Sequence, residues 1–101
     1  MPRRYGKYQL LARLGATSYA EHFLARSAQS TGRLFLLRRL KDTLANDPQW
    51  VDYFLETARL NAAIVSPNVL RVAEIGQQDH RYFAVVELHP GLSLTAYLRR
   101  V

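Results

Sequence analysis

Few side chains in this sequence have the types and spacing that catalysis or metal binding requires. The chain contains no cysteine, which excludes thiolate nucleophiles, disulfides and cysteine-based zinc sites. The histidines, His22, His80 and His89, lack metal-ligand spacing, and their combinations with serine and aspartate form no ordered triad. We therefore expect no metal ion, no cofactor and no hydrolytic centre.

A cation inside an apolar segment is more informative. In the expected strand 33–40, Leu34, Leu36, Arg38 and Leu40 share one face because strand side chains alternate with period two. Arg38 interrupts this apolar row. Its guanidinium could contact a phosphate, or it could pair with a carboxylate or with carbonyl groups beneath the sheet. We expect the structural pairing, and the sequence does not name the partner.

Hydrophobic patterns and turn residues predict one α+β domain with elements in the order βββαββ. The expected strands cover 8–14, 20–25, 33–40, 69–75 and 81–86. A helix is expected over 48–64, because Asp47 is a favoured N-cap and Pro48 suits the first helical position. A polar cluster ending in a glycine, 27–32, predicts a hairpin loop, and a second turn is expected over 76–80.

The predicted helix is apolar around an unusually wide arc. At 100° per residue, its polar stripe is narrow and contains Asp52, Glu56 and Arg59. One side of the helix should pack on the sheet, and another side could contact a partner. Aromatic side chains dominate many binding surfaces, so the interface candidates are Trp50, Tyr53 and Phe54.

The composition is that of a globular chain with excess positive charge. Hydrophobic residues make up 49% and charged residues 22% of the 101 residues, and the net charge is +6. The basic residues form short separate clusters, which favours solvated surface cations over a nucleic-acid site. The start lacks the apolar core of a signal peptide, and no run is long enough to span a bilayer. We expect a cytoplasmic protein without membrane contact.

Several segments, in order and spacing, resemble the N-terminal lobe of bacterial Ser/Thr protein kinases of the Hanks type. The matching segments are Tyr8–Gly15, Ala20–Ala25, Phe54–Leu60, Ser66–Val72, Tyr82–Glu87 and Gly91–Leu94. The resemblance implies a five-stranded antiparallel sheet with one packed helix. The length allows one domain, over 1–101, and the basic residues near the start predict a basic N-terminal arm over 1–7. A hinge and the start of a short C-terminal helix would lie within 87–101.

The family's glycine-rich loop is degenerate here. In the family, a G-x-G-x-x-G motif lets backbone amides approach the phosphates of ATP. Gly15 keeps the first glycine, whereas Thr17 and Ala20 stand at the second and third positions. The resemblance would assign any remaining nucleotide contacts to Gly15, Arg38 and the hinge residues Glu87 and His89. We expect this chain not to bind ATP.

The remaining nucleotide-site positions also depart from the family pattern. The resemblance places His22 at the valine that covers adenine and Leu36 at a small residue beside it, so both would fill the pocket. Arg38 stands at the catalytic lysine, and a planar guanidinium does not replace a compact ammonium. Thr57 stands at the helix glutamate that pairs with this lysine. The family's ion pair is therefore absent on both sides.

These departures predict a pseudokinase-like chain without enzyme activity. The catalytic and metal-binding motifs of the family belong to its C-terminal lobe and are not among these residues. We expect a noncatalytic module that binds a protein partner, or itself, through the helix and the cleft-side surface. One alternative is an N-lobe fragment of a larger Ser/Thr kinase or pseudokinase with weak or no ATP binding. A further alternative is a basic nucleic-acid-binding module.

Overall fold

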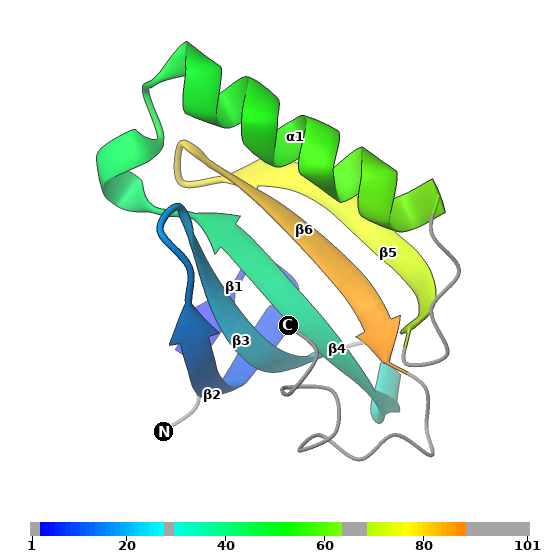
Figure 1. Cartoon of the computed structure of the whole chain (residues 1–101). Coiled ribbons are helices and arrows are strands. Elements are labelled where there is room, and N and C mark those ends of the chain that lie inside the picture. The colour runs from blue at the N-terminus through cyan, green and yellow to red at the C-terminus, as the bar shows by residue number, and fades with distance from the viewer. Residues whose placement is uncertain (1–2, 28–29, 64–68, 89–101) are drawn as a thin grey trace.

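The computed structural model describes residues 3–27, 30–63 and 69–88, which form an antiparallel sheet and one long helix. The strands are β1 (Arg3–Tyr5), β2 (Tyr8–Ala16), β3 (Ala20–Ser27), β4 (Ser30–Leu40), β5 (Val69–Gln78) and β6 (Arg81–Leu88). A 3-10 turn, η1 (Asp42–Leu44), precedes α1 (Pro48–Ala63). The sheet order is β1-β2-β3-β4-β6-β5, and α1 lies across β5 and β6 (Figure 1).

The α+β class and the single packed helix are confirmed, but the expected count of five strands is wrong. Residues 3–5, which we assigned to a basic arm, form a sixth strand, and Tyr5 pairs with Tyr8. The connection is a two-residue hairpin loop in which Gly6 has a φ of 58°, a conformation that glycine adopts at low cost. Tyr5 then buries its ring against Phe83, with 5.5 Å between ring centroids.

Both faces of the sheet carry buried apolar side chains. One face curls around a cluster of Tyr5, Tyr8, Leu10, Phe23, Ala25, Phe35, Leu37, Phe83 and Val85. The other face packs against α1 through Ala20, Leu40, Phe54, Ala58 and Ala84. The alternation predicted for 33–40 is confirmed, because Phe35 and Leu37 belong to the first cluster and Leu40 to the second. Arg38, between Leu37 and Arg39, therefore lies on the helix side of β4.

The start of α1 agrees with its capping prediction. The amide of Gln49 donates to Asp47 Oδ1 at 3.0 Å, and Pro48 occupies the first helical position. The strands run further than expected, since Ser27 pairs with Ser30 and the last hairpin turns at Asp79 and His80 alone. Residues 87 and 88 belong to β6 instead of a hinge, and the expected C-terminal helix lies outside the described residues.

Candidate functional site

The strands β3 and β4 bring three of the predicted site residues together. His22 lies directly opposite Arg38 in the β3–β4 register, and Leu36 lies two residues before Arg38. His22 is 6% exposed and Leu36 is 2% exposed. On the other side of β3, Gly15 pairs with His22, and the space beside its Cα is open. The imidazole and the leucine side chain are thus enclosed in the lobe.

His22 is buried without a hydrogen-bond partner at Nε2. Burial, and to a smaller extent the charge of Arg38, lowers the pKa of His22 to about 4. The side chain is therefore neutral at physiological pH. The neutral imidazole of His22 fills space next to the Arg38 guanidinium and adds no second positive charge there.

The low pKa of His22 predicts a loss of stability in mild acid. In the unfolded chain, His22 becomes protonated near its ordinary pKa of 6.5, whereas in the folded chain it stays neutral until about pH 4. The free energy of unfolding should therefore fall by about 3 kcal/mol as pH drops through this window. Urea unfolding at several pH values measures it, with His22→Leu as the control. An equal pH slope in His22→Leu would contradict the assignment.

Arg38 has a different partner from the carboxylate or carbonyl groups that we expected. Its Nη2 donates to the hydroxyl of Tyr19 at 3.2 Å, and its buried Nε has no hydrogen-bond partner. Tyr19 belongs to the loop between β2 and β3, so this contact ties the loop to β4. Tyr19 was not among the candidates predicted from the sequence. The available signal was an aromatic residue in the short loop that precedes strand 20–25.

Three backbone amides at the β2–β3 turn are satisfied within the turn itself. Thr17 Oγ1 accepts from the amide of Ala20 at 3.1 Å and from that of Tyr19 at 3.4 Å. The amide of Thr17 in turn donates to the carbonyl oxygen of Ala20 at 2.8 Å. The methyl group of Ala20 is fully buried against α1. These three amides cannot join a phosphate cradle without breaking existing hydrogen bonds.

Thr57 also forms its hydrogen bond locally. Its Oγ1 donates to the carbonyl oxygen of Tyr53, one turn earlier in α1, at 2.7 Å. Glu87 is 3% exposed within β6 and lies 3.6 Å from Arg33. The sequence-predicted candidates therefore do not assemble into one nucleotide site. His89 lies outside the described residues.

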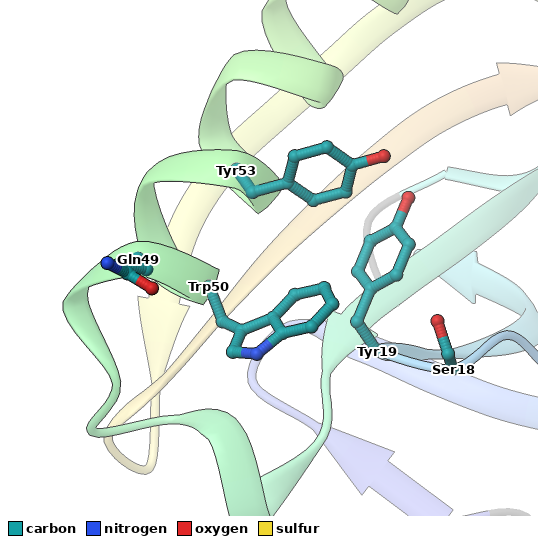
Figure 2. A pocket seen from close by; sticks show the side chains of 5 residues that line it. All are labelled: Ser18, Tyr19, Gln49, Trp50 and Tyr53. Atoms are coloured by element: carbon teal, nitrogen blue, oxygen red, sulfur yellow. The ribbon is translucent and has the colours of Figure 1, made fainter.

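Three aromatic side chains meet between the β2–β3 loop and the start of α1 (Figure 2). Tyr19 stacks on Trp50 with 5.7 Å between centroids, and Tyr53 approaches both rings edge-on. With Ser18 and Gln49, they line a cavity of about 340 Å³. We call Tyr19, Trp50 and Tyr53 the aromatic patch. It contains two of the three predicted interface residues.

The third predicted interface residue lies in the core. Phe54 is 2% exposed and packs with Leu40 and Ala84 under α1, whereas Tyr53 is 51% exposed. The two neighbours differ because one helical step rotates a side chain by 100°. Within this chain, Phe54 anchors the helix to the sheet and offers no free surface.

A charged cluster fixes the strand ends next to the loop. Glu21 Oε1 accepts from Arg39 Nε at 3.1 Å and from Arg81 Nη2 at 2.5 Å, and Arg13 lies 3.9 Å from Oε2. Burial alone would raise the pKa of Glu21, but the hydrogen bond from Arg81 and the contact with Arg39 lower it. Arg81 also donates to the carbonyl oxygen of Leu40 at 2.9 Å. This cluster joins β3, β4 and β6.

Comparison with known proteins identifies the fold. No protein-family model matches the sequence. The chain is 32% identical over 97 residues to the tyrosine-protein kinase MasK of Myxococcus xanthus. The serine/threonine-protein kinase PrkC of Bacillus subtilis is 27% identical over 93 residues. The chain resembles the N-terminal lobe of a bacterial protein kinase. The matches cover 94% and 92% of this kinase-like lobe but only 15% and 14% of the two relatives.

Solved structures agree with the sequence comparison. The Mycobacterium tuberculosis PknI kinase domain, as its C20A mutant, superposes with a TM-score of 0.65 at 20% identity. The match covers 98% of the kinase-like lobe and 40% of that chain. Another PknI kinase domain structure gives 0.61 over 84% of the lobe. At 20% identity, this likeness shows the fold alone.

Two further observations concern the described part of the lobe. Among its residues, no three histidine, aspartate or glutamate side chains lie together as metal ligands. A search of its helices found none long and apolar enough to cross a membrane.

Proposed function

We propose that this chain is a noncatalytic, pseudokinase-type N-terminal lobe that binds a protein partner, or a second copy, through α1 and the cleft-side surface. The observation that carries the proposal is the closed β2–β3 loop. Thr17 takes up the amides that would otherwise be available to phosphates, and Tyr19 holds the loop on Arg38. The proposal includes a cytoplasmic location, motivated by the absence of cysteine.

The surroundings of Arg38 support the same proposal. In the family, a lysine and a helix glutamate form an ion pair that positions ATP. Here a phenol holds Arg38, and Thr57 bonds to its own helix. His22 and Leu36 fill buried positions beside Arg38. Nucleotide binding would require the loop to open and these side chains to move.

A second candidate is an N-terminal lobe within a larger kinase or pseudokinase. The observation that favours it is coverage, because the chain spans only 15% and 14% of the two curated relatives. This candidate shares the closed loop and the aromatic patch. It differs in placing the cleft-side surface against further domains of the same protein.

The proposal predicts that nucleotides do not bind this chain. Isothermal titration with ATP and with ADP, each with and without Mg²⁺, should give no saturable heat. The melting temperature should not rise with nucleotide concentration, because a ligand that binds only the folded state would raise it. Tryptophan emission from Trp50, the single tryptophan, verifies that the titrated sample is folded. Saturable, magnesium-dependent heat would overturn the inference that the closed loop excludes nucleotides.

A further inference from the structure

The aromatic patch is a preformed surface. Tyr19, Trp50 and Tyr53 already contact one another, and the first of these is also held by Arg38. Binding to side chains that are already ordered costs less conformational entropy than binding to free ones. The adjoining cavity, about 340 Å³, is large enough for one bulky side chain. Tyr53 lines this cavity and leaves half of its own surface exposed.

Acidic side chains flank this patch along α1. Glu56 lies three residues after Tyr53 and four after Asp52, so it neighbours both side chains on the helix surface, whereas Asp52 and Tyr53 point about 100° apart. The exposed Arg59 lies on the same polar stripe, three residues after Glu56. Both carboxylates are exposed, and neither forms an ion pair with any other described residue. A partner could therefore pair with them without displacing an existing contact.

The acidic flank is exceptional in this basic chain. Residues 42–58, between Lys41 and Arg59, contain four of the eight acidic residues and no lysine or arginine, a charge of −4. The rest of the chain has 14 basic and 4 acidic residues, so 14 − 4 = +10. This segregation gives the start of α1 a charge complementary to a basic partner, and complementary charge increases both the association rate and the specificity.

The cavity itself favours an uncharged occupant. Arg38 reaches the hydroxyl of Tyr19, and the first turn of α1 presents the positive end of its dipole. Both disfavour a cation deep between the rings. Aromatic walls instead match an apolar or aromatic side chain, which gains from burial and from edge-to-face contacts.

We propose that the aromatic patch binds a basic peptide segment with one large apolar anchor. The anchor fills the cavity beside Trp50, and flanking arginine or lysine side chains pair with Asp52 and Glu56. This inference rests on the proposed interaction function and specifies the chemistry of the partner.

Trp50 provides a direct readout of the site because it is the only tryptophan. The probe is a synthetic peptide with a central phenylalanine between arginines in a glycine-serine background. Titration should change the Trp50 emission saturably, and the affinity should fall with added salt, since exposed charge pairs are screened. Replacing the central phenylalanine by alanine should weaken binding by about tenfold.

Charge reversal tests the flank. The double variant Asp52→Lys and Glu56→Lys should bind the arginine peptide about tenfold more weakly. Asp42→Lys reverses one charge of the same acidic segment at an exposed position outside the patch, and it should weaken binding less than the double variant does. A matched peptide with glutamates in place of arginines should bind more weakly than the parent peptide.

The outcomes separate this inference from the proposed function. Tighter binding of the glutamate peptide or of an uncharged peptide would overturn the basic partner and leave an interaction module. Equal affinity of the double variant would also overturn the role of the acidic flank. If no peptide changes the Trp50 emission, and light scattering shows no association at micromolar concentration, both this inference and the proposed interaction function fail.

Discussion

Replacing Glu21 with glutamine is expected to lower the free energy of unfolding by about 3 kcal/mol. The carboxylate accepts hydrogen bonds from Arg39 and Arg81, whose side chains are only 14% and 13% exposed. Removing its charge leaves two largely buried guanidinium groups without an anion, and a buried unpaired charge is costly. The rings of Tyr5 and Phe23 contact Arg39 but do not neutralise it.

The control for this prediction is Glu74→Gln. Glu74 pairs with Lys7 at 3.3 Å, but the lysine side chain is 51% exposed, so the pair should contribute less than about 1 kcal/mol. Glutamine can still accept from the hydroxyl of Tyr8, which donates to Glu74 at 2.9 Å. Urea unfolding followed by Trp50 emission measures both variants. Equal losses in the two variants would contradict a special role for the Glu21 cluster.

The pH dependence provides a second check on Glu21. The pKa of Glu21 is lower in the folded chain than the ordinary value of 4.5. The stability that its negative charge contributes is therefore fully present above pH 4.5. The stabilisation is lost as pH falls through the folded pKa. Glu21→Gln should remove this loss at low pH while leaving the separate His22 effect at higher pH.

Local sequence signals predicted the elements that depend on short-range chemistry. Asp47 and Pro48 marked the start of α1 because capping involves only neighbouring residues. The alternation in β4 correctly placed Arg38 on the face opposite Phe35 and Leu37. The segments resembling kinases correctly predicted the fold for the same reason, since each is a continuous stretch.

Features that depend on distant contacts could not be read from the sequence. The strand β1 is stabilised by Tyr5, which packs on Phe83, 78 residues away along the chain. The partner of Arg38 is a tyrosine 19 residues earlier, brought close only when β3 and β4 pair. Thr17 was recognised as a lost glycine, but its hydroxyl satisfies the loop amides in a way that requires the folded turn.

The neighbours Tyr53 and Phe54 were predicted as equivalent interface residues, and the structure separates them. Phe54→Ala is expected to cost about 3–5 kcal/mol of stability, because it leaves a cavity between α1 and the sheet. Tyr53→Ala should cost about 1–2 kcal/mol, since half of its surface is exposed and its losses are two edge-on ring contacts. Urea unfolding compares the two.

Binding should show the opposite order. Tyr53→Ala is expected to weaken the phenylalanine-arginine peptide by about tenfold, because the exposed wall of the cavity is lost. The matched variant Phe54→Leu keeps an apolar side chain in the core, so it should fold and bind within about twofold of the parent chain. If substitution of Phe54 lowers stability more and substitution of Tyr53 lowers affinity more, α1 uses one face for stability and the adjacent face for recognition. Equal loss of binding in Tyr53→Ala and Phe54→Leu would instead mean that recognition depends on the packing of the whole helix, and the aromatic patch would then not be a separate site.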